Sequence, residues 1–409
     1  MKYYSENHFF TKILLNIQIV FGWVFIMPFS YLIPKKKGLS IVIGKEDGLF
    51  SDNTKYFFLH CIKERGSTYF VTQNKETYQL LKSNGLDKIL FYPTFKSIAI
   101  LLRSEFLIVD NVKWIKNLKY YFLFNSKKIQ LWHGIGSKRI ELDNPRYNNS
   151  RVKLLIFLKG LLTGTVPFYK YIISTSEYYS ENLYKKAFKY NEILNLGQPR
   201  NDIFFRKIEH FDMINVDRDI HKEVMKRKDA GDFIVIYTPT FRDTGGNILT
   251  DKVLDFVRMD KFCQDNKLFL IIKQHPYSSA FDISNCDNIV IYNKHLDIYP
   301  IMAISDLMIT DYSSMYLDFV LMDKPIVFFI YDYEKYIKID RSLRVDFLEI
   351  TPGSKCYQQN ELEREIILNI NNGALYKTER EKVTKLSYKY IDGKASERIY
   401  SLIKRGFAD

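Results

Sequence analysis

Five polar residues stand directly after short apolar runs, where their side chains could take part in acid–base or phosphate chemistry. They are His133, Arg242, His275, Ser313 and Ser314. A neutral imidazole near pH 7 can take a proton from a hydroxyl group. An arginine offers a fork of N–H donors that suits phosphate, and backbone N–H groups are free at the start of a helix. Together these residue types suit phosphoryl transfer.

Each of these residues also has an ordinary structural interpretation. Arg242 could pair with the adjacent Asp243, and His275 could be held by a backbone carbonyl. Ser313 or Ser314 could simply cap a helix. Ligands of open parallel sheets, however, bind outside the carboxyl ends of the strands. Five such groups at equivalent strand ends therefore favour a shared site.

The elements that must position these residues are clearest between residues 307 and 336. Residues 307–310 read as a strand, 311–314 as a tight polar turn, 315–322 as a helix and 326–331 as a second strand. Lys324 and Pro325 end the helix before the second strand begins. The pattern predicts a βαβ crossover with the two serines at its turn.

Earlier apolar runs alternate with helical patterns, which predicts an α/β protein with parallel sheets. Strands are expected over residues 40–44, 69–72, 89–92, 106–109, 129–132 and 172–174, then 233–237 and 268–273. The stretch 210–232 is charged and lacks apolar periodicity, and 409 residues suffice for two cores. We therefore predict one domain over residues 35–215 and a second over 216–409.

Residues 13–34 carry no charge, and three lysines follow at Lys35, Lys36 and Lys37. A single membrane span, a helix lying in the interface and a hairpin-like insertion around Pro28 all fit this stretch. The lysines would keep the rest of the chain in the cytoplasm. Residues 151–171 also read as a basic amphipathic helix, which suits either acidic lipid or packing on the sheet. We predict a membrane-anchoring segment over residues 1–34 and a location at the cytoplasmic face of the cell membrane.

The amino-acid composition limits the kinds of partner that the protein could bind. The net charge of +13 favours an anionic partner, but no zinc-finger spacing, basic zipper or aromatic–basic consensus points to nucleic acid. The four cysteines are scattered and form no C-x-x-C pair, which fits a reduced compartment. No cluster of metal ligands is visible, so neither a metal nor a cofactor is expected.

Several motifs follow one another in an order that resembles the CDP-glycerol glycerophosphotransferase family, which includes teichoic acid primases and polymerases and similar capsule enzymes. The matching motifs are Trp132-His133-Gly134 with Lys138, residues 197–202, residues 237–243, His275-Pro276, residues 310–314, Lys324-Pro325-Ile326 and Tyr331-Asp332. The chain departs from the family pattern at residues 135–137, on the acceptor side.

The resemblance implies a GT-B fold, in which two Rossmann-like domains face each other across a cleft and the second holds most of the nucleotide. It implies attack by a hydroxyl of a lipid-linked glycan acceptor on the β-phosphorus of CDP-glycerol or a related CDP-polyol, with release of CMP. In this scheme His133 is the base and His275 the donor to the departing phosphate. The expected substrate-binding residues are Arg242, Thr310, Ser313, Ser314, Gly134, Lys138 and Arg200.

Two other functions remain open at this point. A CMP-sugar-dependent glycosyltransferase of capsule synthesis would share the GT-B frame and the histidine–proline pair. A membrane-bound scaffold would keep the fold without turnover, although intact His133 and His275 count against it. An esterase is excluded because the sequence has no G-x-S-x-G motif.

Overall fold

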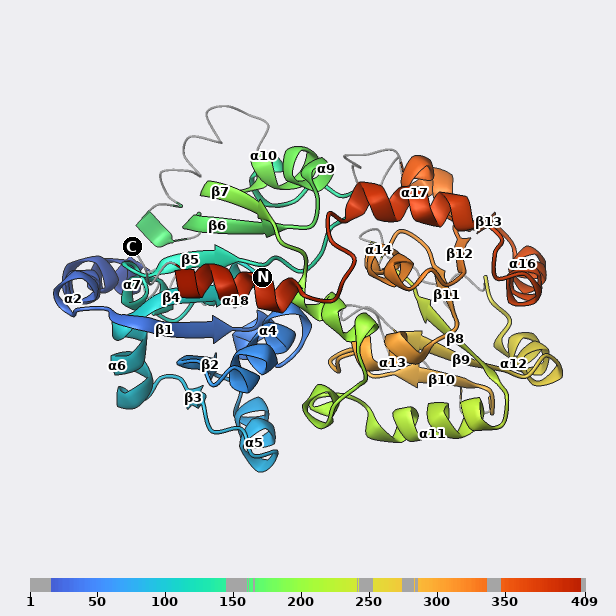
Figure 1. Ribbon diagram of the computed structural model, residues 1–409, viewed down its shortest axis with the longest axis horizontal. Helices are drawn as coiled ribbons and strands as arrows, with labels where there is room; N and C mark the ends of the chain where they lie inside the picture. Colours follow the sequence, from blue (N-terminus) through green and yellow to red (C-terminus); the bar gives the residue numbers. More distant parts are fainter. Residues whose placement is uncertain are drawn as a thin grey trace, which may run out of the picture.

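Two parallel sheets, each covered by helices, form the two lobes of the protein, and they lie side by side in Figure 1. The computed structural model describes residues 16–144, 160, 162–164, 166–240, 242, 253–273, 283, 286–336 and 347–405. We call the part around the first sheet the first lobe and the part around the second sheet the second lobe. The predicted α/β class with parallel sheets is confirmed.

The first sheet has seven strands in the order β3-β2-β1-β4-β5-β6-β7. Its strands are β1 (Lys36–Ile43), β2 (Thr68–Thr72), β3 (Ile89–Phe91), β4 (Ser104–Val109), β5 (Lys127–Gln130), β6 (Phe168–Ser174) and β7 (Lys189–Asn195). The helices of this part are α2 (Met27–Leu32), α3 (Lys45–Gly48), α4 (Asp52–Lys63), α5 (Lys75–Ser83), α6 (Phe95–Arg103), α7 (Lys119–Phe122), α9 (Glu177–Tyr179) and α10 (Lys185–Ala187). The central strands are apolar on both faces because helices cover both sides of a parallel sheet.

The second sheet has six strands in the order β10-β9-β8-β11-β12-β13. Its strands are β8 (Phe233–Thr238), β9 (Leu268–Lys273), β10 (Ile289–Tyr292), β11 (Leu307–Thr310), β12 (Ile326–Phe329) and β13 (Ser354–Cys356). The helices that follow β7 are α11 (Arg218–Asp229), α12 (Phe256–Asp265), α13 (Tyr299–Ile304), α14 (Met315–Phe319), α15 (Tyr333–Lys335), α16 (Gln359–Asn371), α17 (Lys377–Ser387) and α18 (Ala395–Arg405).

Both sheets reverse their strand order beside their first strand, between β1 and β4 and between β8 and β11. In open parallel sheets a ligand crevice forms at this point, outside the carboxyl ends of the strands. The predicted crossover around β11 is confirmed, but its helix is shorter than expected. The α-helix ends at Phe319, and a 3₁₀ turn, Val320–Met322, completes the segment before Lys324 and Pro325.

The last helix, α18, returns from the second lobe to the first, where it packs on α4 (red helix in Figure 1). Ile399 and Ile403 are buried in a core cluster of the first lobe. Asp202 fixes the start of the helix by accepting hydrogen bonds of 2.9 Å from the backbone N–H groups of Ala395 and Ser396. This return was not predicted.

A helical stretch over residues 16–32 lies on the first lobe and contains a π-helical turn, Gly22–Ile26. The Trp23 ring packs edge-on against Tyr121 and Phe124. A Cβ atom on Gly22 would lie 2.3 Å from the Tyr121 ring, so only glycine permits this close approach. Within the described part of the chain, no helix is long and apolar enough to cross a membrane. Residues 1–15 of the predicted membrane-anchoring segment lie outside the described residues.

The amphipathic helix predicted over residues 151–171 is wrong at its carboxyl end. Residues 168–171 begin β6, whose β-branched and aromatic side chains suit a strand between β5 and β7. Residues 151–159 lie outside the described residues.

Candidate active site

A cavity of about 450 Å³ lies between the lobes, at the carboxyl ends of β1, β4, β8 and β11. The first lobe contributes Lys45, Asp52, Asn111 and His133 to its lining. The second lobe contributes Pro239, Lys273, Tyr299, Ser313 and Ser314. The two strand-order reversals therefore meet at one site, as the rule for open sheets predicts.

His133 lies on the first-lobe wall of this cavity, in the loop after β5, and its side chain is exposed there. The residue before it, Trp132, adopts a left-handed conformation with φ of 56°. Its N–H donates to Gln130 Oε1 at 2.9 Å, and its carbonyl accepts from Asn53 Nδ2 at 2.7 Å. The Trp132 ring also lies against the imidazole, with 4.0 Å between ring centroids. The loop is thus held directly before the histidine.

The surroundings of His133 favour its neutral form. Desolvation at the cavity wall lowers the pKa of His133, and the positive charges of Lys45 and Arg200 lower it further, against an opposing contribution from Asp52. A histidine that is neutral well below pH 7 can accept a proton at physiological pH. His133 is therefore in the form that a general base needs, and its lowered pKa makes it a weaker base than an ordinary histidine.

Arg200 connects three parts of the site. Its Nη1 donates to Asp52 Oδ1 at 2.7 Å and to the backbone carbonyl of His133 at 2.9 Å. Its Nη2 donates to Asp318 Oδ2, in the second lobe, at 2.6 Å. Gly134 makes room for this group, because a Cβ atom there would lie 2.6 Å from Nη2. Gly134 also has φ of 129°, which other residues rarely adopt.

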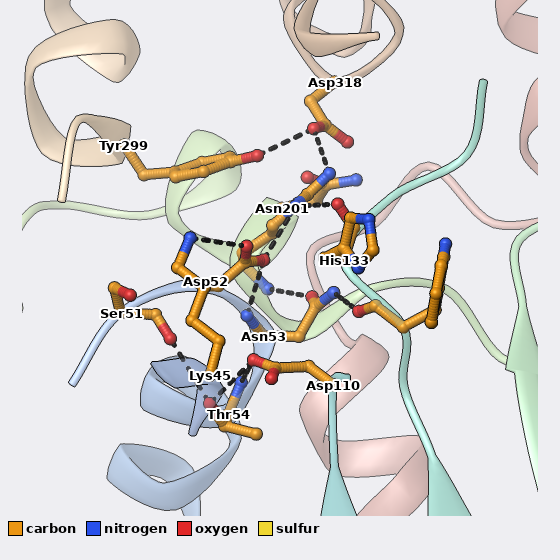
Figure 2. A network of polar contacts seen from close by, with 12 residues as sticks. Lys45, Ser51, Asp52, Asn53, Thr54, Asp110, His133, Asn201, Tyr299 and Asp318 are labelled. Atoms are coloured by element: carbon orange, nitrogen blue, oxygen red, sulfur yellow. Dashed lines mark hydrogen bonds and ion pairs between the residues drawn. The ribbon is translucent and has the colours of Figure 1, made fainter. Parts of the chain in front are cut away.

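Asp318 lies in α14 and is fully buried. Besides Arg200, it accepts hydrogen bonds from the Tyr299 hydroxyl at 2.8 Å and the Tyr388 hydroxyl at 3.1 Å. Figure 2 shows Tyr299 and Asp318 on one side of the network and Asp52 on the other. A buried carboxylate needs such partners to remain charged. The arginine and the aspartate therefore form an ion pair between the lobes.

A second buried ion pair joins the lobes beside the first. Lys55 Nζ in α4 lies 2.7 Å from Asp297 Oδ2, which also accepts a bond of 2.8 Å from the Tyr56 hydroxyl. Lys55 donates as well to the carbonyls of Asp212 and Ile214, at 2.6 and 2.8 Å. These contacts fix the relative position of the two walls of the cavity.

Arg242 does not offer the donors to the cavity that the sequence predicted. Its Nε and Nη2 donate to Asp332, at 2.7 and 3.0 Å. Its Nη1 donates to Asp311 Oδ2 at 2.8 Å and to the Thr240 carbonyl at 2.7 Å. The side chain is 1% exposed, because the two carboxylates hold it inside the second lobe. Arg242 therefore braces the turn that starts at Asp311 and leads to the two serines.

The remaining predicted residues fall into three groups. Ser313 and Ser314 line the cavity, although the Ser314 side chain forms no capping hydrogen bond to α14. Thr310 is buried between strands, with its hydroxyl 3.1 Å from that of Thr238. Lys138 reaches from the first lobe to the Tyr336 ring, 5.7 Å from its centroid.

The second predicted catalytic histidine, His275, lies outside the described residues. Lys273, two residues earlier, lines the cavity at the end of β9. The strand therefore leads toward the cavity, and the role of His275 stays a prediction.

Sequence reasoning missed the four lysines that line the cavity, which are Lys45, Lys113, Lys273 and Lys294. Lys273 Nζ donates to the carbonyls of Asn293 and Leu296, at 2.7 and 2.9 Å. Desolvation, and then the charge of Lys45 from the other lobe, lower the pKa of Lys273 to about 7. The Nζ atom of Lys45 lies 3.5 Å from Asp52 Oδ2. An anionic ligand in the cavity would be attracted to Lys45 and would favour the charged form of Lys273.

The cavity wall contains backbone in a sparsely populated conformation. Four cavity-lining residues other than glycine have positive φ, namely Glu46, Asp52, Trp132 and Glu141. Such conformations cost roughly 1–3 kcal/mol each and persist where the surrounding structure enforces them, most often at functional sites. Among the described residues, no group of three His, Cys, Asp or Glu side chains could hold a metal ion.

Two Rossmann-like lobes that face each other across a cavity at the carboxyl ends of both sheets form the GT-B architecture. The chain belongs to the family described as CDP-Glycerol:Poly(glycerophosphate) glycerophosphotransferase, whose model matches residues 26–405. It is therefore a transferase of this family, as the motifs predicted.

Characterised relatives add to this assignment. The teichoic acid glycerol-phosphate primase of Bacillus subtilis strain 168 is 27% identical over 347 residues, which cover 81% of this chain and 80% of the primase. The poly(glycerol phosphate) polymerase of Staphylococcus epidermidis is 28% identical over 320 residues. That match covers 71% of this chain, which spans only 41% of the polymerase.

A ribitol-phosphate polymerase is also related to the chain. TarL of Staphylococcus aureus strain NCTC 8325 is 23% identical over 421 residues, covering 97% of this chain and 67% of that protein. Among solved structures, the wall teichoic acid polymerase TagF, in a variant soaked with CDPG, superposes with a TM-score of 0.75. The match has 20% identity and covers 99% of this chain and 97% of the TagF chain, which supports the fold.

Proposed function

We propose that the protein transfers glycerol phosphate, or a related polyol phosphate, from a CDP-polyol to a lipid-linked acceptor in the synthesis of a teichoic acid or capsule-type polymer. The observation that carries this proposal is the cavity between the lobes, which His133 and Lys45 line from the first lobe and Lys273 lines from the second. The family and its teichoic acid relatives support a CDP-polyol as the donor.

In the proposed reaction, an acceptor hydroxyl gives its proton to His133 as its oxygen forms a bond to the β-phosphorus. The bond between that phosphorus and the bridging oxygen breaks, and CMP leaves with the bridging oxygen. A positioned general base of this kind contributes typically about 10²- to 10⁴-fold. His275 would donate a hydrogen bond or proton to the departing phosphate.

The negative charge of the diphosphate needs positive partners in the cavity. Lys45 and Lys273 enter it from opposite lobes, and Ser313 and Ser314 offer hydroxyl groups. Because α14 is only five residues long, its dipole is small, and the lysines supply most of the charge. Arg242 acts behind this surface by bracing the serine turn.

The test is to offer CDP-glycerol, CDP-ribitol and CMP-sialic acid in parallel, each with a lipid-linked disaccharide acceptor, and to identify products by mass. A phosphodiester product from either CDP-polyol, together with CMP, is expected. A glycosidic product from the CMP-sugar would replace this proposal with the glycosyltransferase. No product from any donor would support the non-enzymatic scaffold.

We also propose that the protein binds the cytoplasmic face of the membrane through the helical stretch over residues 16–32. One side of this stretch packs on the first lobe, and the other side exposes large apolar side chains. These are Ile17, Val20, Phe21, Val24, Phe25, Phe29, Tyr31 and Leu32. An exposed apolar helix face of this kind suits insertion into the interface of a bilayer.

Deletion of residues 1–34 would be a poor test of this surface, because Ile26 belongs to the core of the first lobe. The triple substitution Val24→Ser, Phe25→Ser and Phe29→Ser changes only exposed positions. We expect it to reduce sedimentation with vesicles of acidic phospholipid while turnover of a soluble acceptor analogue persists. Unchanged sedimentation would show that another surface binds the membrane.

A further inference from the structure

We propose that Arg200 is a positioning residue, which sets the distance between the His133 loop of the first lobe and the serine turn of the second. The inference rests on the proposed function, in which His133 is the base. Arg200 was predicted to bind phosphate or nucleotide, but its two terminal nitrogens already bind protein acceptors.

On the first lobe, a single nitrogen of Arg200 holds two elements. Nη1 binds both the Asp52 carboxylate, at the start of α4, and the backbone carbonyl of His133. The Asp52 carboxylate in turn accepts the Asn53 N–H at 2.9 Å, and Asn53 holds the carbonyl of Trp132. The backbone carbonyls of Trp132 and His133 are therefore both tied to the first turn of α4, the first by Asn53 and the second through Arg200.

On the second lobe, the other nitrogen of Arg200 holds the helix that follows the serine turn. Nη2 binds Asp318, which lies in α14, and α14 starts directly after Ser314. The guanidinium also stacks over the Tyr299 ring, 5.1 Å from its centroid. Movement of α14 relative to the His133 loop would break at least one of these contacts.

The planar fork of arginine is essential to this arrangement. Its Nη1 and Nη2 point to different lobes at a fixed separation, whereas a lysine ammonium is one point charge on a flexible stem. Arg200→Lys would therefore keep the positive charge but lose one of the two connections. Reacting groups in enzymes are sensitive to such changes, because a displacement of about 1 Å can cost roughly 10²-fold in rate.

Charge and position can be separated experimentally. The charged groups that influence His133 are Asp52, which raises its pKa, and Lys45 and Arg200, which lower it. Arg200→Gln removes one of the lowering charges, so the acid limb of the pH–kcat profile should move to higher pH. Arg200→Lys retains the charge, so the limb should stay in place while kcat falls.

The experiment compares Arg200→Lys with Arg380→Lys in the full-length protein. Arg380 is also buried, and donates to Asp323 at 2.9 Å and to the carbonyls of Leu375 and Gly373 at 2.6 and 2.9 Å, away from the cavity. We expect kcat to fall on the order of 10²-fold for Arg200→Lys, and to remain within about twofold for Arg380→Lys, with thermal stability lowered in both.

Two results would overturn the inference: an unchanged kcat for Arg200→Lys, or an equal fall for both variants. If Arg200→Lys does not fold, Tyr299→Phe replaces it, because this change removes only the hydroxyl that binds Asp318. A severalfold fall in kcat is expected there, and no fall would contradict the inference. His133→Ala in the same assay distinguishes the failures, since turnover by that variant would remove the proposed base itself.

Discussion

Two buried arginines of this protein have the same kind of surroundings but different positions. Arg200 lies between Asp52 and Asp318, and Arg242 lies between Asp311 and Asp332. Each stacks on aromatic rings, Arg200 on one tyrosine and Arg242 on three. The carboxylates of the first pair come from different lobes, whereas those of the second belong to the same lobe.

An arginine that is paired with two carboxylates affects the site through the elements that it holds together. The charge of such a guanidinium is already matched by two carboxylates, although the buried Nε of Arg200 has no hydrogen-bond partner among the described residues. Its position then decides its effect. Arg200 acts between the lobes and on the His133 loop, and Arg242 acts within the second lobe on the turn that carries Ser313 and Ser314.

The largest expected effect concerns the residue that Arg200 holds. His133→Ala should lower kcat by roughly 10²- to 10⁴-fold, because it removes the proposed general base. Circular dichroism and thermal denaturation serve as controls, and they should show an intact fold. Near-normal release of CMP by the folded variant would remove His133 from the mechanism. The contact between Arg200 and the His133 loop would then have no role in catalysis.

The kinetic parameters of Arg242→Lys and Arg200→Lys should differ. Arg242 braces the serine turn, so its substitution should raise KM for the CDP-polyol on the order of tenfold, the equivalent of about 1.4 kcal/mol. Arg200→Lys should act mainly on kcat. Steady-state kinetics measures both parameters, and identical changes for the two variants would mean that the positions of the arginines do not matter.

Substitution of Lys273 should have an effect on KM of similar or smaller size, and Lys128 provides a matched control. Lys128 also donates to two backbone carbonyls, those of Phe124 and Ser126, and desolvation lowers its pKa to about 7. Lys128 does not line the cavity. Lys273→Met should raise KM for the CDP-polyol several-fold, whereas Lys128→Met should leave it unchanged. Equal KM values for both variants would show that Lys273 is only structural.

The smallest expected effect is a shift in pH dependence. His133 must be neutral to accept a proton, and its pKa is lowered by desolvation and by nearby positive charge. The ordinary pKa of histidine is about 6.5. Activity should therefore persist below that pH and fall only at lower pH. Arg242→Lys should not move this acid limb, because Arg242 is not among the groups that shift the His133 pKa. An acid limb at or above the ordinary value would contradict the assigned environment.

Much of the fold could be predicted from local patterns. Apolar runs predicted β11 and its crossover, and the cavity collects His133, Ser313 and Ser314 from separate strand ends. The strands β7, β10 and β13 were missed because they are short or polar. The return of α18 to the first lobe depends on tertiary packing, which no local pattern shows.

The site was harder to predict than the fold. Lys45 and Asp52 lie in and after a polar loop in which Glu46, Asp47 and Asp52 have positive φ, and only its glycine, Gly48, is a sequence signal for such a conformation. Asp318 did leave a signal, as a single carboxylate within the apolar helix Met315–Phe319. A buried carboxylate requires a cationic partner, and that requirement could have pointed to Arg200.

The most direct measurement is a crystal structure of the protein with CDP-glycerol bound. We expect the diphosphate in the cavity between the lobes, with the β-phosphorus facing His133, the ammonium groups of Lys45 and Lys273 in contact with phosphate oxygens, and the His275 imidazole within hydrogen-bonding reach. A diphosphate bound outside this cavity, or both imidazoles turned away from it, would contradict the proposed mechanism.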